Sequence, residues 1–256
     1  MQRRKVGLEA GTGYFPAAHT AMQTAPDYTQ GFTVHGKVMS ASLILYGYWR
    51  SSAAFRVRIA LNLKGLRYET RSVHLVRDGG QQHAPDYVAL NPLQLVPTLV
   101  DGDRVMTQSM AIAEYLDEIH PQPALLPADA AGRARVRALA QIVACDIHPI
   151  GNLRVLQQIG AQFNADDEQK GIWMRHWIAT GFQALETMLA DSKDTGRYCH
   201  GDTPGLADLC LVPQVYNARR WKMALDDYPT IVRIDAACGE LDAFMAAMPE
   251  RQPDAP

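Results

Sequence analysis

The sequence predicts a small α/β domain followed by an all-helical domain. Strand-like and helix-like segments alternate from Leu43 to about residue 121. After Pro127 the strand patterns largely stop, and residues 128–250 carry mostly helical patterns. Residues 121–129 join the two halves and contain three prolines, which is typical of a linker. This change of pattern at a proline-rich stretch indicates two domains.

The first half begins with a strand, a helix and a second strand. Residues 43–49 (LILYGYW) are apolar and aromatic, as strands are. Residues 52–64 predict a helix with a strong apolar face, which ends at Gly65. Residues 68–75 predict the second strand, and the polar loop RDGGQQ of residues 77–82 follows it.

A hairpin and another helix complete this half. Residues 98–100 and 104–107 predict two short strands on either side of an Asp-Gly turn. Apolar residues then recur with the spacing of an amphipathic helix, at Ile112, Tyr115, Leu116 and Ile119. Ser109 can cap the start of this helix, and Pro121 ends it. In the second half, the helical pattern is interrupted near residues 149–151 and 191–205, and at Pro229.

Composition and charge exclude several classes of function. Lys and Arg number 25 against 27 Asp and Glu, so no basic excess predicts a nucleic acid or an anionic membrane as partner. No apolar run is long enough for a membrane span. The four cysteines form no CxxC pair and no Cys/His cluster with zinc spacing, so no metal site is predicted. Isolated cysteines are typical of buried thiols in a reducing compartment, which predicts a cytoplasmic protein.

The first 40 residues differ from the rest. They have no sustained hydrophobic period and no apolar stretch behind Arg3 and Arg4, so they make a poor signal peptide. We expect residues 1–40 to be a disordered extension, or the product of a start codon assigned too far upstream.

Two helix starts carry hydroxyl groups that could bind an anion. Ser51-Ser52 follows the first strand, and Gln108-Ser109 opens the later helix. Helix N-termini offer free N–H groups and positive potential. Between them, Val96-Pro97 enters a strand, where a cis peptide bond could expose the Val96 backbone to a peptide-like ligand. The Ser51-Ser52 segment contains no convincing nucleophile of its own, since no Cys or adjacent His is present.

The segments YWRSSAAFRVRIALNLKG, DGGQQ, NPLQLVPTL and QSMAIAEYL resemble the thioredoxin-fold domain of glutathione transferases. DIHPIGNLRVL, NARR and the terminal RQPDAP resemble more narrowly the zeta class, which includes maleylacetoacetate isomerase. The resemblance covers about residues 41–256. It implies the glutathione transferase architecture, with a thioredoxin-like glutathione-binding domain over residues 41–121 and an all-helical substrate domain over residues 128–250. It also implies a homodimer.

The resemblance supplies the missing nucleophile, because in this family it is the sulfur of bound glutathione. A serine hydroxyl and a helix N-terminus stabilise the thiolate. Ser51 matches the leading thiolate partner and Ser52 the second, and both are the candidate catalytic residues. The residues implied to hold glutathione are Ser51, Ser52, Gln82, Val96, Gln108, Ser109 and Arg56. The sequence departs from the family at Ala53, where the usual pattern is Ser-Ser-Cys.

The family reaction is a cis–trans isomerisation of a conjugated, dicarboxylate alkene, and it consumes no glutathione. Arginine suits such substrates because its planar guanidinium can hold a carboxylate in two hydrogen bonds. The implied substrate-binding residues are Arg50, Arg154, Arg220 and Asn152. Asp146 and His148 could resemble a catalytic pair, but we expect them to be structural at a helix break, with His148 lining the pocket.

Four readings of function remain open. The first is isomerisation of maleylacetoacetate to fumarylacetoacetate in the breakdown of tyrosine through homogentisate. The second is maleylpyruvate isomerisation in gentisate breakdown. The third is glutathione conjugation or dehalogenation of small halo acids. The fourth is a transferase-like interaction module without chemistry, although the retention of Ser51, Gln82, Pro97, Gln108 and Ser109 argues against it.

One departure from the family concerns folding. The buried helix of the second domain usually starts with Ser or Thr-x-x-Asp, whereas here Gly205 stands three residues before Asp208. Glycine offers no side-chain acceptor at an N-cap. We therefore expect Gly205→Thr to raise the melting temperature.

Overall fold

The computed structural model describes residues 43–256, so the expected extension over residues 1–40 lies outside the described residues. A four-stranded sheet has the order β2-β1-β3-β4. Its central strand β1 (Leu43–Gly47) pairs in parallel with β2 (Tyr68–Ser72) and antiparallel with β3 (Thr98–Asp101). β4 (Arg104–Thr107) pairs antiparallel with β3 at the edge. The sheet is therefore mixed, with a parallel pair from a β-α-β unit and an antiparallel hairpin.

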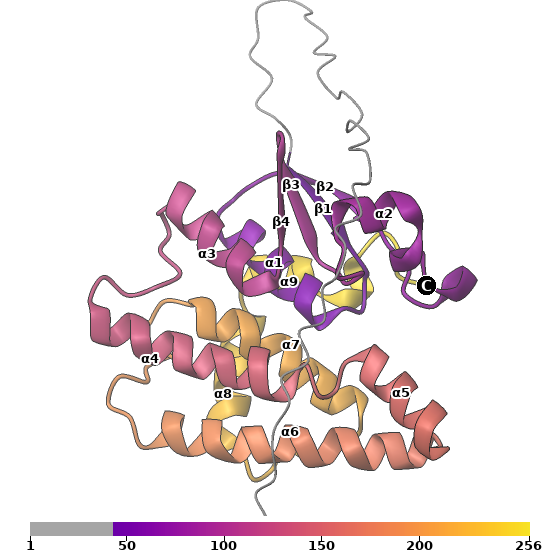
Figure 1. Cartoon of the computed structure of the whole chain (residues 1–256). Coiled ribbons are helices and arrows are strands. Elements are labelled where there is room, and N and C mark those ends of the chain that lie inside the picture. The colour runs from indigo at the N-terminus through magenta and orange to yellow at the C-terminus, as the bar shows by residue number, and fades with distance from the viewer. Residues whose placement is uncertain (1–42) are drawn as a thin grey trace, which may run out of the picture. The chain divides into compact units, whose positions relative to one another are not determined.

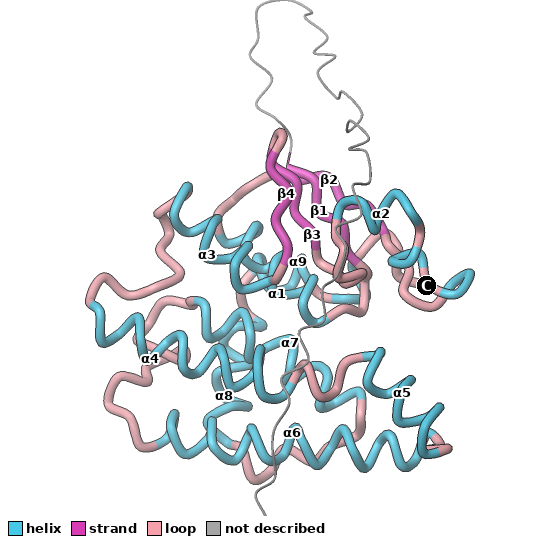
Figure 2. Tube along the Cα trace, in the orientation of Figure 1, coloured by secondary structure: helices cyan, strands magenta, loops and turns pink. Residues whose placement is uncertain are grey.

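Three helices cover the two faces of this sheet. Figures 1 and 2 show α1 (Ser52–Leu63) and α3 (Ser109–Ile119) on one side and α2 (Pro85–Leu90) on the other. The core between sheet and helices is formed by Leu45, Phe55, Ile59, Leu99, Ile112 and Leu116. α2 was not predicted, although Pro85 at its first position is a typical start signal. The polar loop before it folds into two 3-10 turns, Arg77–Gly79 and Gln81–His83.

The second half is helical throughout the described residues, as predicted. It contains α4 (Ala130–Gln141), a π-helical turn (Ile142–Ile147), α5 (Leu153–Phe163), α6 (Asp167–Ala190), α7 (Leu206–Arg220), α8 (Pro229–Gly239) and α9 (Asp242–Ala247). α7 is the central helix, with its residues 206–215 all buried. The α/β half followed by an all-α half confirms the predicted fold class.

The start of α7 corrects the expectation for Gly205. Asp208 accepts hydrogen bonds from the backbone N–H of Gly205 at 2.8 Å and of Cys199 at 2.9 Å. The Leu206 N–H donates to Leu125 O at 2.9 Å, which brings the linker backbone against the helix start. A Cβ on Gly205 would lie 2.7 Å from Leu125 O. The expectation that threonine stabilises this position is wrong, because the side chain would strike the linker backbone.

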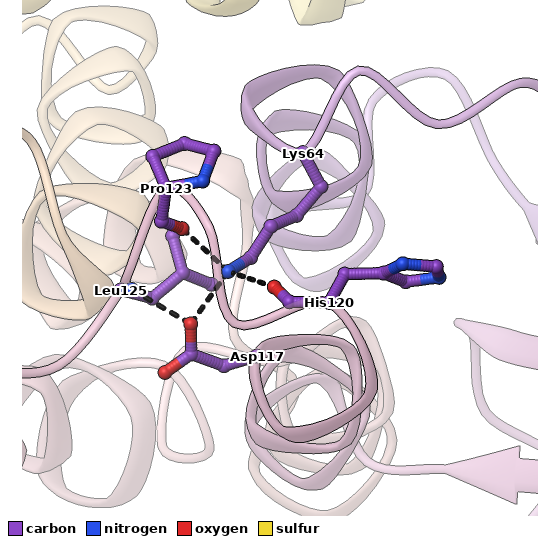
Figure 3. A network of polar contacts seen from close by, with 5 residues as sticks. All are labelled: Lys64, Asp117, His120, Pro123 and Leu125. Carbon is purple, nitrogen blue, oxygen red and sulfur yellow. Dashed lines mark hydrogen bonds and ion pairs between the residues drawn. The ribbon is translucent and has the colours of Figure 1, made fainter.

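A buried lysine fixes the linker to the end of α1. Lys64 Nζ is fully buried and donates to Asp117 Oδ1 at 2.6 Å, His120 O at 2.7 Å and Pro123 O at 2.5 Å. The same Asp117 oxygen accepts from Leu125 N–H at 2.8 Å. Figure 3 shows these groups converging on the ammonium. Each donor of the lysine therefore has an acceptor, and the linker path is tied to the first domain.

The last helix returns to the first half of the chain. Arg58 Nε donates to Ala247 O at 2.9 Å, and Asn62 Nδ2 donates to Ala243 O at 2.9 Å. Both donors lie on α1, and both acceptors lie on α9. The yellow C-terminal elements accordingly lie beside the indigo α1 in Figure 1. The two ends of the described chain are thus joined by polar contacts.

Candidate active site

The turn between β1 and α1 presents hydroxyl groups at a helix start. Ser51 is the N-cap of α1, and its Oγ accepts from Ala54 N–H at 3.2 Å. The Ser51 N–H donates to Tyr48 O at 2.9 Å, which closes the turn. Because the Ser51 oxygen acts only as an acceptor here, its own hydroxyl proton can be donated to a ligand. Ser52 follows as the first residue of the helix, where the N–H groups have no intrahelical partner.

Three polar groups on the neighbouring loops lack hydrogen-bond partners within residues 43–256. Gln82 is only 8% exposed, and its Nε2 donates to Leu75 O at 3.3 Å. Its buried Oε1 has no hydrogen-bond partner. The Val96–Pro97 bond is cis, and neither backbone polar group of Val96 makes a hydrogen bond within residues 43–256. Buried polar groups are normally paired, so the Gln82 oxygen is a candidate for a contact with a ligand. The half-buried backbone of Val96 is a second candidate, because its N–H and C=O have no partner among residues 43–256.

These groups line one cavity between the two halves of the molecule. Its volume is about 840 Å³, within the usual range for small-molecule sites. The sequence-predicted residues that line it are Arg50, Ser51, Ser52, Gln82, Val96, His148, Asn152, Arg154 and Arg220. They come from the β1–α1 turn, the loops before α2 and β3, and the helical half. One cavity therefore brings together residues that lie up to 170 positions apart, from Arg50 to Arg220.

Three predicted glutathione contacts do not line the cavity. Gln108 is exposed, with a positive φ of 68°, and Ser109 is buried. Arg56 is buried as well, and its Nη1 donates to Ser109 Oγ at 3.3 Å. The roles of Arg56, Gln108 and Ser109 toward glutathione stay predictions.

The arginines give the cavity a positive character. Desolvation, and then the like charge of Arg50, lower the pKa of Arg220, which places these two cations within electrostatic reach of each other. Each lies over a tryptophan, Arg50 at 5.6 Å from the ring centroid of Trp49 and Arg220 at 4.8 Å from that of Trp221. Arg154 lies in the first turn of α5 and is exposed. Cations that lie close together repel one another, and a bound anionic ligand would offset this repulsion.

Asn152 and His148 complete the helical wall. Asn152 is the N-cap of α5, and its Oδ1 accepts from Arg154 N–H at 3.2 Å. His148 follows the π-helical turn that ends α4, and such turns often occur at functional sites. Burial, and next the positive charge of Arg56, lower the pKa of His148 to about 3. The imidazole therefore lines the cavity as a neutral group, whereas Asp146 is exposed and does not line it.

Sequence reasoning missed several residues of the cavity wall. The polar or aromatic ones are Tyr48, His83, Gln94, Gln157, Asp167, Lys170, Asn217 and Trp221. Asn217 could have been found, because it lies three residues before Arg220 on one helix face and accepts from Arg220 Nη2 at 3.1 Å. The contribution of Lys170, at the start of α6, depends on how the helices pack, and no local pattern predicts that.

Among the described residues, no group of three or more His, Cys, Asp or Glu side chains is placed to hold a metal ion. Within residues 43–256, no helix has the length and apolar character that crossing a membrane requires.

Comparisons with known proteins agree with this geometry. The family model for the N-terminal domain of glutathione S-transferases matches residues 41–118. A probable maleylacetoacetate isomerase of Vibrio cholerae is 55% identical over 214 residues, which are 84% of this chain and 99% of the relative. The solved holo structure of a bacterial maleyl pyruvate isomerase, a zeta-class glutathione S-transferase, is 54% identical with a TM-score of 0.81. It covers 83% of this chain and 100% of its own.

The chain belongs to the zeta class of glutathione transferases. This confirms the resemblance inferred from the sequence and the glutathione transferase architecture. Another relative, a maleylacetoacetate isomerase of Methylobacterium extorquens, was solved with bound malonate and GSH. It is 45% identical to this chain, with a TM-score of 0.80. The match covers 83% of this chain and 99% of the relative.

Proposed function

We propose that this protein is a glutathione-dependent cis–trans isomerase that converts maleylacetoacetate to fumarylacetoacetate. The observation that carries the proposal is a single cavity that combines the Ser51 helix start with Arg50, Arg154 and Arg220. The 55% identity to a probable maleylacetoacetate isomerase supports the same reaction. Such an enzyme would act in the breakdown of tyrosine through homogentisate.

The residues of the first half fit a glutathione molecule. Glutathione is a tripeptide with amide groups along its backbone. The unpartnered backbone of Val96 and the unpartnered Oε1 of Gln82 are suited to amide and ammonium groups. The Ser51 hydroxyl and the free N–H groups of the first turn of α1 are suited to the sulfur. The relative solved with bound GSH supports the assignment.

Bound glutathione supplies a thiol that can add reversibly to a conjugated alkene, so that the former double bond can rotate. The Ser51 hydroxyl donates a hydrogen bond that favours the thiolate, and the positive end of the α1 dipole acts in the same direction. A free thiol has a pKa of about 8.5, so these donors raise the fraction that is reactive at neutral pH. The neutral His148 leaves the positive charge of the cavity to its cationic residues.

The three arginines hold the two carboxylates of the substrate and keep them in place during rotation. Arg50 and Arg220 line the same cavity and can bind one carboxylate, and Arg154 can hold the other from the start of α5. Their charge also stabilises the enolate-like state that forms when a nucleophile adds to the alkene. Asn152 positions Arg154 through its cap of α5.

A second substrate is supported by the comparison as well. The zeta-class structure at 54% identity is that of a maleyl pyruvate isomerase. Maleylpyruvate is shorter but carries the same cis-dicarboxylate chemistry. The same cavity residues would serve both substrates, so the choice between them rests on measurement.

The deciding experiment is ultraviolet turnover of maleylacetoacetate and of maleylpyruvate, each with and without glutathione. We expect glutathione-dependent loss of one cis acid at a much higher kcat/KM than the other. Ser51→Ala is expected to lower kcat about 100-fold, as the loss of a transition-state donor does in other enzymes. Arg154→Ala is expected to raise KM about 10-fold or more through the lost carboxylate contact.

Ser52→Ala tests the second candidate for the thiolate partner, because it removes the adjacent hydroxyl at the first position of the same helix. It is expected to change kcat much less than Ser51→Ala does. Glutathione binding without turnover of either acid would contradict the proposal. It would favour glutathione conjugation as the activity instead.

We also propose that the protein works as a homodimer in the cytoplasm. The family resemblance supports the dimer, and the free state of all four cysteines supports a reducing compartment. Sedimentation equilibrium would test the assembly, and a mass near 28.3 kDa rather than twice that value would reject it.

A further inference from the structure

Both backbone polar groups of Trp49 are tied to the far end of the chain. The Trp49 N–H donates to Asp254 Oδ2 at 3.0 Å, across 205 positions of sequence. The Trp49 C=O accepts from Arg58 Nη2 at 3.0 Å, and Nε of the same guanidinium donates to Ala247 O. Burial lowers the pKa of Arg58 to about 10, so the guanidinium stays charged at neutral pH. We call residues 247–254 the C-terminal segment.

Trp49 lies within the turn of residues 48–51, between β1 and α1, which we call the catalytic turn. Its neighbours Tyr48 and Arg50 both line the cavity, and Ser51 follows two positions later. The turn is closed by the hydrogen bond from Ser51 N–H to Tyr48 O. A displacement of the Trp49 backbone would therefore move the Ser51 hydroxyl and the Arg50 side chain together.

Asp254 itself is held in place by contacts on its other side. Ser72 Oγ, at the end of β2, donates to the same Oδ2 at 2.8 Å. Gln252 Nε2 donates to Ala246 O at 3.0 Å and to Met248 O at 2.8 Å, which fixes the path of the C-terminal segment. Hydrogen bonds to an ionised carboxylate are stronger than those between neutral groups. The C-terminal segment can therefore hold the Trp49 N–H in one position, which a mobile water molecule could not do.

We infer that Asp254 is a positioning residue for the catalytic turn. Through the Trp49 N–H it fixes where the Ser51 hydroxyl points, and thereby how strongly glutathione bound at Ser51 ionises. The inference rests on the proposed role of Ser51 toward glutathione. No substrate contact is assigned to Asp254, because it does not line the cavity.

The test is the pKa of the thiol of bound glutathione, measured from thiolate absorbance against pH in the full-length protein. Asp254→Ala is expected to raise this pKa by about 0.5 to 1 unit, which lowers the thiolate fraction by about 3- to 10-fold at pH values well below the thiol pKa. The acid limb of the kcat/KM profile should shift upward by the same amount. Asp254→Asn keeps an oxygen that can accept both hydrogen bonds, and it is expected to restore the wild-type value to within about 0.2 unit.

Gln252→Ala is the comparison variant, since it removes two hydrogen bonds of the C-terminal segment but leaves both hydrogen bonds to the Asp254 carboxylate in place. It should lower the melting temperature and raise the thiol pKa by less than Asp254→Ala does. Ser72→Ala releases one side of the Asp254 carboxylate and should raise the thiol pKa by less than Asp254→Ala, so the test survives if Asp254→Ala does not fold.

An unchanged thiol pKa in Asp254→Ala and Ser72→Ala would overturn the inference, as would an equal rise in Gln252→Ala. The measurement of the thiol pKa from thiolate absorbance needs no isomerase substrate. Failure of the proposed function would appear instead as absent turnover by the wild-type protein, so the two failures are distinguishable.

Discussion

His148 is a histidine that folding keeps uncharged. Its pKa falls to about 3 because the ring loses hydration and faces the positive charge of Arg56. In the unfolded chain an ordinary histidine has a pKa of about 6.5. Between these two values the unfolded state binds the extra proton, so the free energy of unfolding falls as pH drops from about 6.5 toward 3.

We therefore expect His148→Gln to weaken the acid sensitivity of the protein. From pH 7 to pH 5 the wild type should lose about 1–2 kcal/mol more of its free energy of unfolding than the variant loses. Urea unfolding at both pH values gives the comparison, and carboxyl groups common to both proteins cancel in the difference. Equal losses would mean that His148 is not kept neutral by the fold.

At the same scale, the sequence predicted part of the cavity wall from local features. Ser51 and Val96 could be found because hydroxyls at a helix start and a proline at a strand entrance have local physical meaning, whereas Gln82 was implied only by the family resemblance. The burial of Arg56 could not be predicted, because its position in the serine motif does not show that its helix face turns inward. Tyr48 and Lys170 reach the cavity through tertiary packing, which one sequence does not encode in a short pattern.

The start of α7 shows how a helix end can be stabilised without a capping side chain. Asp208 accepts from the backbone of Gly205, and the linker carbonyl of Leu125 accepts from Leu206. The missing Cβ at Gly205 is what lets the linker approach so closely. The local capping rule failed here because a neighbour distant in sequence occupies the space.

Gly205→Thr is accordingly expected to lower the free energy of unfolding by about 1–3 kcal/mol, the usual cost of forcing extra atoms into a filled site. Thermal unfolding by circular dichroism would measure it. Gly239→Ala in α8 is the control, because a Cβ there meets nothing within 4 Å and alanine favours helix. A rise in melting temperature for Gly205→Thr would restore the capping argument.

Lys64 connects two elements, because it joins the end of α1 to α3 and to the linker that follows α3. Lys64→Met should lower the free energy of unfolding by about 3 kcal/mol, because Asp117 and two carbonyls lose a buried partner. Arg71→Met breaks an ion pair with Glu69 in which both side chains are about half exposed, at 48% and 50%. That control should cost less than about 1 kcal/mol.

The measurement is the midpoint and slope of urea unfolding for both variants. Similar small costs for Lys64→Met and Arg71→Met would contradict the view that the linker is held from α1.

For the whole molecule, the order of elements and the two-part architecture could be predicted from periodicity, prolines and glycines. The helix breaks near residues 149–151 and 191–205 and at Pro229 were expected and are present, whereas the break between α5 and α6 at residues 164–166 was not predicted. What could not be predicted is how the chain closes on itself. Arg58 and Asn62 look like ordinary polar residues of a helix, yet they bind carbonyls of α9 about 180 positions later.

That closure has a consequence for how the protein is made. The catalytic turn leaves the ribosome early, but its Trp49 N–H meets its partner only when Asp254 has been synthesised, 205 residues later. At about 5–20 residues per second, translation needs roughly 10–40 s to cover that distance. Throughout this interval the first domain carries a serine turn whose backbone is not yet fixed. A nascent or prematurely terminated chain should therefore lack a fully organised glutathione site.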